Sequence, residues 1–415
     1  MESAPQHRAA YLGALALALG IGAAIAAEAP RASADTSSGD SARSTPTASA
    51  QAASAQASST QAASARPARA ARAARTAARP VPRGSVAPVT AEPAVTITRS
   101  GQSPLLLRSG STGATELSGI TYAGGTNYYA VGDDGAPTIW HVYTSLDSRS
   151  GRVRSTLVTG GISAPELGSD SEGIALGPSG NRVWVSDEVA STINEFSLAT
   201  GQKTGSVAVP NIYRPANVQN NMGLESLTYG ADRLWTANEE ALRSDGALST
   251  TAAGSWVRIQ EFDGPDLAAR RQYAYRTDPI SRLSPFVSVE RSGLVDLLAL
   301  SNGQVLALER ELGGYLPRFR TRIYLIDFTG ASDVAELSSL ASGSGFTPVG
   351  KTLLWQGDTG FSNFEGITLG PRLSDGSYAL LLVSDDGIGA MAQRQDSFSL
   401  ILSGVTAPAP APIQV

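Results

Sequence analysis

The sequence contains no cysteine, two histidines and two lysines among its 415 residues. Without cysteine, a disulfide framework, a lipid-modified N-terminal cysteine and a thiol nucleophile are all excluded. The same absence, together with so few histidines, excludes most zinc sites, which depend on Cys and His ligands. Since Lys203 and Lys351 are the two lysines of the sequence, a site that needs several positive charges would have to use arginines.

Histidine-based hydrolysis also finds little support in the chain. His7 lies near the N-terminus, and no nucleophilic histidine stands in the arginine-rich motif of a histidine phosphatase. A Ser-His-Asp esterase would need His141, yet the G-x-S-x-G elbow is missing, so His141 is interpreted as a packed strand residue. No P-loop or dinucleotide-binding glycine motif occurs in a strand–helix setting. Long helical periodicity is absent.

The first 94 residues lack the composition of a folded domain. Residues 1–34 combine a polar start, the apolar run Ala9–Ala27 and small residues at AxA-like sites, which predicts a secretory signal peptide. A retained membrane anchor is the alternative, since this run could just span a bilayer. Residues 35–94, rich in Ala, Ser, Pro and Arg, predict a disordered linker, and residues 406–415 form a Pro/Ala-rich tail. We therefore expect a secreted protein or one associated with the cell envelope through its N-terminal segment.

Charge separates the N-terminal segment from the rest of the chain. Met1–Thr98 carries 9 basic and 5 acidic residues, so the remainder has 32 − 9 = 23 basic and 37 − 5 = 32 acidic residues, a net charge of −9. A folded body with this balance is a poor nucleic-acid binder. We expect a monomer that acts on a small substrate and has no nucleic-acid partner.

One hairpin pattern organises the folded part of the chain. Asp170–Leu176 and Arg182–Glu188 are rich in strand-forming residues, and Gly177–Asn181 between them has turn composition. Antiparallel pairing across this turn would bring Glu172 and Asp187 to the same open end of the hairpin. Like charges so placed repel each other, and a bound cation would stabilise them.

The same plan recurs five times, and strand-like runs follow each hairpin at intervals of roughly 50–70 residues, the spacing of a repeat protein. Repeats of four short strands are typical of a β-propeller, so residues 95–405 predict an all-β propeller with five visible repeats and five or six four-stranded blades. Val95–Arg99 or Leu105–Arg108 could supply the outer strand that the fifth repeat lacks. A divergent sixth blade could lie in Asp278–Arg291 or in the N-terminal strands.

The polar ends of these hairpins are predicted to crowd around one mouth of a central channel. So many carboxylates in one depression are unfavourable unless metal ions or protons neutralise them, and an oxygen-only ligand set suits Ca²⁺. The alternative for any single residue is turn capping, which is common for Asp and Glu at strand ends. The candidate calcium ligands are Asp133, Glu172, Asp187, Glu225, Asp296, Glu309, Glu365 and Asp385, with Asn238 beside them.

Several of these motifs resemble one known family. Ser171-Glu172-Gly173-Ile174, Asn363-Phe364-Glu365-Gly366-Ile367, Trp235-Thr236-Ala237-Asn238-Glu239 and Val383-Ser384-Asp385-Asp386 are similar to motifs of the phytase-like, "esterase-like activity of phytase", domain family. The resemblance runs from about Glu116 to Leu402. It implies a propeller related to the calcium-dependent alkaline phytases, which are usually exported or envelope-bound.

The resemblance also implies basic residues that grip phosphate, and arginines must supply them here. Arg310, Arg243 and Arg394 are nearest to the repeated motifs and are the candidates for substrate binding. Arg310 follows Glu309 directly and is the first choice for a phosphate clamp; a salt bridge to residues around Glu309 is the alternative.

Metal-assisted hydrolysis of a phosphoester is the activity that these residues favour. Calcium held by the carboxylates would bind phosphate oxygens and orient a water, and Glu239 or Asp386 could serve as general base. Two alternatives remain. One is a calcium-dependent lactonase or esterase propeller, for which Asn217, Asn220 and Asn238 offer ligands. The other is a non-catalytic binding propeller that calcium stabilises.

Overall fold

The computed structural model describes residues 94–133, 135–281, 289–314, 318–387 and 393–405. The predicted signal segment, the linker and the C-terminal tail lie outside these ranges, as does part of the Asp278–Arg291 segment considered for a sixth blade. No helix among the described residues is both long and apolar enough to cross a membrane. The described residues include two 3-10 turns, η1 (Asn211–Tyr213) and η2 (Pro215–Asn217), and their other regular elements are strands.

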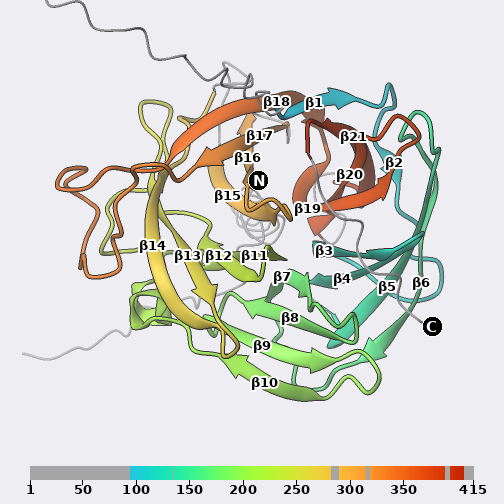
Figure 1. Ribbon diagram of the computed structural model, residues 1–415, viewed down its shortest axis with the longest axis horizontal. Helices are drawn as coiled ribbons and strands as arrows, with labels where there is room; N and C mark the ends of the chain where they lie inside the picture. The colour runs from blue at the N-terminus through green and yellow to red at the C-terminus, as the bar shows by residue number, and fades with distance from the viewer. Residues whose placement is uncertain (1–93, 134, 282–288, 315–317, 388–392, 406–415) are drawn as a thin grey trace, which may run out of the picture. The chain divides into compact units, whose positions relative to one another are not determined.

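Five antiparallel sheets surround a common centre, so the fold is a five-bladed β-propeller (Figure 1). Blade 1 consists of β3 (Leu117–Gly124), β4 (Asn127–Gly132), β5 (Thr138–Leu146) and β6 (Val153–Ser163). Blade 2 consists of β7 (Ser171–Leu176), β8 (Arg182–Asp187), β9 (Thr192–Ser197) and β10 (Lys203–Val207). Blade 3 consists of β11 (Leu224–Gly230), β12 (Arg233–Asn238), β13 (Trp256–Asp263) and β14 (Ala268–Arg276).

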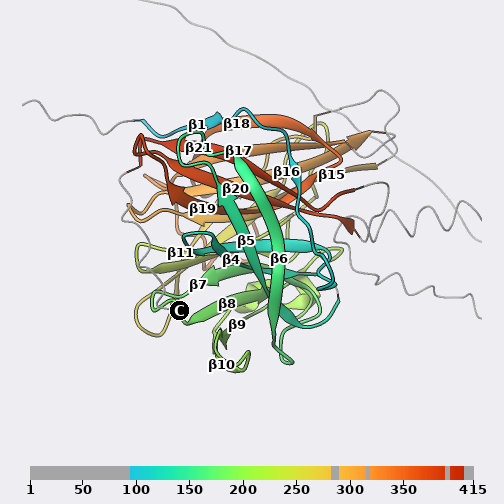
Figure 2. The same cartoon turned by 90° about the vertical axis from the view of Figure 1, so that its right-hand side faces the viewer.

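The last two blades complete the ring. Blade 4 consists of β15 (Val289–Ala299), β16 (Val305–Gly314), β17 (Phe319–Asp327) and β18 (Gly350–Gly360). Blade 5 consists of β19 (Asn363–Arg372), β20 (Tyr378–Asp385), β21 (Asp396–Ser403), β1 (Thr96–Arg99) and β2 (Leu105–Leu106). In blade 1 the side view shows β6 as the strand nearest the viewer, outside β5 (Figure 2).

The N-terminal end of the described chain closes the ring. β1 pairs antiparallel with β21 from Thr96↔Ser403 to Arg99↔Leu400, and β2 pairs with the beginning of the same strand at Leu105↔Ser397. Both segments predicted as candidates for the missing outer strand therefore pair with the fifth blade. This pairing covers the edge of β21 and makes the short β1 the outer strand of the blade.

Apolar side chains fill each interface between neighbouring blades. Val131 of blade 1 and Ile174 of blade 2 belong to one buried cluster, and Phe262 of blade 3 shares another with Trp184 of blade 2. The other three interfaces have equivalent clusters. Stacking the apolar faces of successive sheets is what makes such repeats stable.

Glycines allow the innermost strands to approach one another closely. A Cβ atom on Gly119 of β3 would lie 2.2 Å from the Glu172 carbonyl oxygen, and one on Gly366 of β19 would lie 2.4 Å from the Ser118 carbonyl oxygen. Gly173 of β7 is equally crowded, with the Leu227 nitrogen at 2.5 Å. Only glycine fits where two backbones come this close. The Ser-Gly and Glu-Gly pairs of the repeats therefore hold neighbouring inner strands, and the acids beside the glycines, close together.

Candidate metal centre at the open end of the hairpins

Every inner strand carries a β-bulge, which lies near the first residues of β3, β7, β11 and β19 and at Val295 in the longer β15. The register shifts between Leu224 and Ser226 in blade 3 and between Phe364 and Gly366 in blade 5, so Glu225 and Glu365 are the extra residues. Blades 1, 2 and 4 have a register shift at the corresponding place. A bulge turns a side chain out of the regular alternation of a strand. The acids at the bulges can therefore point to the centre of the ring.

Three overlapping groups of carboxylates lie at this end of the inner hairpins. Within each group, one oxygen of every member lies within 4.8 Å of the others. Asp133 belongs to two of the groups and Glu172 belongs to two, so the groups form one continuous band. Their members are Glu116, Asp133 and Asp385; Asp133, Asp170 and Glu172; and Glu172, Glu188 and Glu225.

Glu239 and Glu365 extend this band toward blade 4. Glu365 lies close enough to raise the pKa values of Glu172 and Glu225, and Glu239 raises the pKa values of Glu188 and Glu225. We use the name central acidic cluster for these nine residues. They are Glu116, Asp133, Asp170, Glu172, Glu188, Glu225, Glu239, Glu365 and Asp385.

Burial and mutual repulsion make ionisation of this cluster unfavourable. Burial is the first cause that raises the pKa of Glu172 well above its usual range, and the charges of Glu225 and Asp133 raise it further. The pKa values of Asp133, Glu188 and Asp385 are raised by burial and by neighbouring carboxylates in the same way. A bound cation would remove both penalties.

Some oxygens in the cluster have no hydrogen-bond partner among the described residues. They are Oδ1 of Asp133, Oε2 of Glu188 and Oε2 of Glu225. Glu188 is 1% exposed, and its other oxygen accepts a 2.5 Å hydrogen bond from the Gly223 amide. A buried carboxylate oxygen without a partner is unfavourable, so each of these positions is suited to a metal ion. Because all donors are oxygen, the set fits calcium.

Arg310 of β16 inserts a positive charge into the cluster from blade 4. Its guanidinium forms ion pairs with Glu239, at 3.2 Å, and with Glu365, at 2.5 Å, and its side chain is 2% exposed. The Nε atom of Arg310 has no hydrogen-bond partner in the described part of the chain. Thus Arg310 lies between the acids of blades 3 and 5 and does not pair with Glu309, the residue before it.

The candidate ligands predicted from the sequence divide into two sets. Asp133, Glu172, Glu225 and Asp385 lie in the three groups, and Glu365 lies beside them. The other three candidates, Asp187, Asp296 and Glu309, have their contacts elsewhere.

The carboxylate of Asp187 accepts a hydrogen bond from the Ala190 amide and so caps a turn. Asp296 accepts hydrogen bonds from the amides of Leu297 and Ile367, at 2.8 Å each, and thereby links β15 to β19. Glu309 binds Lys351 Nζ at 2.6 Å. These three residues therefore lie outside the groups of mutually close carboxylates found among the described residues.

The candidates for proton transfer and for substrate binding also separate. The pKa of Glu239 is raised to about 7, because the effect of burial exceeds the opposite effect of the Arg310 charge. Asp386 accepts a hydrogen bond from the Glu116 amide at 3.1 Å. Arg243 is exposed, and the exposed Arg394 pairs with Asp396 at 2.8 Å. Of the three candidate arginines, Arg310 is the one that contacts the central acidic cluster.

Reasoning from the sequence missed Glu188, which follows β8 directly. The structure pairs Ser171 with Asp187 and then bonds the Glu188 amide to the Asp170 carbonyl, at 3.0 Å. Asp133 has the equivalent bond to the Glu116 carbonyl, so Glu188, and not Asp187, corresponds to Asp133. Consecutive strand residues point to opposite faces, and an error of one residue exchanges them.

Glu116 and Asp170 were also missed, although the sequence contains a signal for them. Each stands two residues before the inner-strand position occupied by Ser118 in blade 1 and Glu172 in blade 2. Both residues lie directly before their strands, and Glu116 has a left-handed backbone with φ of 49°, so the alternation of side chains along a strand does not give their directions. Asn363 has the same relation to Glu365, and its amide nitrogen donates to that carboxylate at 2.9 Å.

Two of the three asparagines considered for a lactonase site, Asn217 and Asn238, are committed to other contacts. Asn217 Nδ2 donates to the Ile212 carbonyl and to Ser244, and Asn238 Oδ1 accepts from the Arg258 amide. Asn220 has a left-handed backbone with φ of 48°.

Comparison with protein families agrees with this geometry. The family model described as phytase-like, "esterase-like activity of phytase", matches residues 112–387. The chain belongs to the phytase-like family. The match includes every residue of the central acidic cluster as well as Arg310.

No curated protein has a matching sequence. Several solved structures resemble this phytase-like chain at low identity. The glutaminyl cyclase of Myxococcus xanthus is 11% identical, with 74% of this chain and 96% of that chain covered and a TM-score of 0.33. A gluconolactonase of Xanthomonas campestris is 10% identical, with 76% and 99% covered and a TM-score of 0.33. The hydrazine synthase of Kuenenia stuttgartiensis is 12% identical, with a TM-score of 0.30; 66% of this chain is covered, but only 58% of that chain.

Proposed function

We propose that this protein is an exported, calcium-dependent phosphoester hydrolase whose reaction takes place at the central acidic cluster. The observation that carries the proposal is the unpaired carboxylate oxygens of Asp133, Glu188 and Glu225, each within a group of mutually close acids. Family membership supports an ester bond as the target. Export is supported by the signal-like composition of residues 1–34.

Calcium would be held by the carboxylates of the overlapping groups, with Glu172 and Asp133 shared between neighbouring positions. When bound, it would neutralise these acids and polarise a phosphate oxygen. The carboxylates themselves would fix the position of the reaction, because the bulges and the close approach of the inner strands limit their movement.

Glu239 of the central acidic cluster and Arg310, which pairs with it, would act on the substrate. With a pKa raised to about 7, Glu239 can take up or release a proton near neutral pH, as a general acid or base requires. Arg310, fixed between Glu239 and Glu365, would direct its unpaired Nε–H toward a phosphate oxygen. Asp386, which is held by the Glu116 amide, is the second candidate for general base.

Phosphate release from phytate and from p-nitrophenyl phosphate tests the proposal. We expect turnover that requires calcium and disappears with EDTA. Glu172→Gln should lose this turnover, because Glu172 belongs to two of the carboxylate groups. The matched control is Glu166→Gln, since Glu166 is an exposed acid that belongs to none of the groups identified in the described chain.

A non-catalytic propeller stabilised by calcium is the second candidate. It is favoured by the commitment of the Arg310 guanidinium to two carboxylates, which leaves little cationic surface for phosphate. An increase in melting temperature with calcium, together with no turnover of either phosphoester, would establish this candidate and refute the hydrolase.

A further inference from the structure

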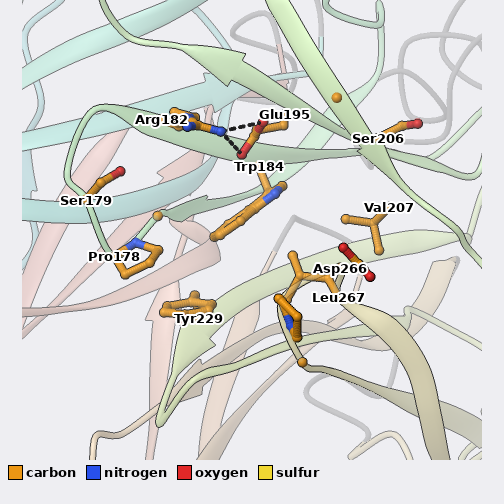
Figure 3. Close-up of a pocket in the computed structure, with 14 residues that line it drawn as sticks. Pro178, Ser179, Arg182, Trp184, Glu195, Ser206, Val207, Tyr229, Asp266 and Leu267 are labelled. Atoms are coloured by element: carbon orange, nitrogen blue, oxygen red, sulfur yellow. Dashed lines mark hydrogen bonds and ion pairs between the residues drawn. The ribbon is translucent and has the colours of Figure 1, made fainter.

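An open groove of about 470 Å³ lies between blades 2 and 3, at the turn end of the inner hairpins (Figure 3). The β7–β8 turn, which includes Pro178 and Ser179, forms one side, and Pro265–Leu267 of the β13–β14 turn forms another. Glu172 lies at the opposite end of β7, so the groove is separate from the central acidic cluster. Its volume is within the range of small-molecule sites.

A comparison between two blades explains why the groove exists. Arg182-Val183-Trp184 in blade 2 corresponds to Arg233-Leu234-Trp235 in blade 3, and the two tryptophans pair with Glu195 and Glu261 respectively. In both blades the arginine forms an ion pair with that glutamate. The two blades thus present the same Arg–Trp–Glu arrangement on neighbouring faces.

The two tryptophans differ in what covers them. Trp235 is stacked by Phe328, the residue after β17, with ring centroids 5.0 Å apart. The residue after β13 is Gly264, which offers Trp184 no such ring. Trp184 instead has Tyr229 at 5.3 Å and 33°, and the groove opens beside the two rings. Trp184 is 9% exposed and Tyr229 is half-buried, so a strip of apolar ring surface borders the groove at the place that Phe328 fills in the next blade.

The polar groups of the groove select against anions. Arg182 is the basic residue among those that line it, and its guanidinium is engaged by Glu195 at 3.2 Å. Asp266 adds a second carboxylate, so the lining carries a net charge of −1. The exposed hydroxyls of Ser179 and Ser206 complete the rim. An uncharged ligand with an apolar face and several hydroxyls would satisfy both the rings and the rim.

We propose that this groove binds a neutral carbohydrate, with one sugar ring packed on Tyr229 and on the exposed part of Trp184. The carboxylates of Glu195 and Asp266 would accept hydrogen bonds from sugar hydroxyls at the edges of that ring. This site is independent of the proposed hydrolase reaction and of calcium.

Titration of the full chain with maltose, cellobiose, lactose and trehalose tests the proposal. Binding is measured by tryptophan fluorescence and by calorimetry. Sugar concentrations should reach about 20 mM, because contacts with a single sugar ring give weak affinity. We expect saturable binding of at least one sugar, unchanged by EDTA. Gly205→Leu should weaken it at least tenfold. Gly205 lines the groove, has no left-handed backbone and has room for a Cβ, which would lie 3.4 Å from Glu195 Oε2.

Gln202→Leu is the matched control, because it adds the same side chain at an exposed position just before β10 and outside the groove. It should bind sugar like the unmodified chain. Tyr229→Ala, which removes one ring and leaves Trp184, should also weaken binding while the melting temperature confirms folding. Absence of binding to all four sugars, or equal binding by the Gly205→Leu variant, would overturn the proposal.

Discussion

Two buried glutamates in different blades differ in how their charge is compensated. Glu309 of blade 4 and Glu188 of blade 2 are 0% and 1% exposed. Lys351 and the Tyr275 hydroxyl bind one oxygen of Glu309, at 2.6 Å each, and the Asp278 amide binds the other at 3.1 Å. One oxygen of Glu188, by contrast, has no partner among the described residues.

The blade 4 arrangement is complete without any ligand, because protein groups already neutralise the charge. The Lys351 ammonium also lies 4.2 Å from the ring centre of Tyr324, a cation–π contact. In blades 1 to 3, burial and neighbouring acids raise the pKa values of Asp133, Glu188 and Glu225, and no comparable cation satisfies their free oxygens. Acids of the same type thus indicate a structural ion pair in one region and a ligand site in the other.

The largest effect is expected where the two regions meet, at Arg310. In calcium-free buffer, Arg310→Met should destabilise the fold by about 3–5 kcal/mol, because Glu239 and Glu365 would remain buried without their cation. Chemical denaturation with and without calcium measures the loss, and calcium should recover part of it. Arg320→Met is the control, since its pair with the exposed Asp358 lies on the surface and should cost less than about 1 kcal/mol. Equal losses in the two variants would contradict the role assigned to Arg310.

Removing the charge of Glu309 in blade 4 should destabilise the fold less than the Arg310 substitution, and calcium should not change the loss. Glu309→Gln keeps the shape of the side chain but leaves Lys351 without its buried ionic partner, so we expect a loss of about 2 kcal/mol. The loss should be the same in calcium and in EDTA, as measured by urea denaturation. A loss that appears only when calcium is present would show that Glu309 binds the ion.

The same substitution at Glu188, in the central acidic cluster, should stabilise the calcium-free fold instead of destabilising it. Glu188→Gln removes a charge that its neighbours repel and keeps an oxygen to accept from the Gly223 amide. We expect the calcium-free protein to become more stable, because a repelled charge is removed from the buried cluster, and to respond less to calcium. Melting curves across a calcium titration check this outcome. Destabilisation of the calcium-free protein would mean that the Glu188 charge is compensated in the fold.

The pH dependence of stability should follow from the raised pKa values. Since burial holds the folded-state pKa of Glu239 at about 7, above the usual range of an unfolded Glu, the folded protein binds the extra proton between these values. In EDTA, stability should therefore be greatest in mild acid and fall as the pH rises through about 7. Calcium competes with protons for carboxylates, so its stabilising effect should grow over the same interval. A calcium effect that does not depend on pH would contradict this linkage.

The repeated hairpins carried enough information to predict the fold. Turn residues at the middle of each repeat and apolar strands on either side predicted blades, and the five-bladed propeller confirms that prediction. Both N-terminal segments considered for ring closure pair with β21. The number of blades was left open because the sequence did not show whether those segments belonged to the fifth blade or to another.

Composition and spacing indicated which end of the hairpins is acidic, but not the side-chain directions. Register at a bulge depends on the pairing of both strands, so the choice between Asp187 and Glu188 required the structure. The contacts of Asp296 and Glu309 come from neighbouring strands or from residues far along the chain, such as Ile367 and Lys351. Local patterns contain no signal for such contacts.

The smallest effect is expected at Arg394, which was a candidate for substrate binding on sequence grounds. Its side chain is 51% exposed and pairs with Asp396, so Arg394→Ala should change the free energy of unfolding by less than about 0.5 kcal/mol, with or without calcium. The same variant separates stability from function. If phosphate turnover also stays unchanged, substrate recognition depends on Arg310 and the central acidic cluster. A rise in KM without a change in stability would instead place Arg394 at the substrate and extend the site toward the beginning of β21.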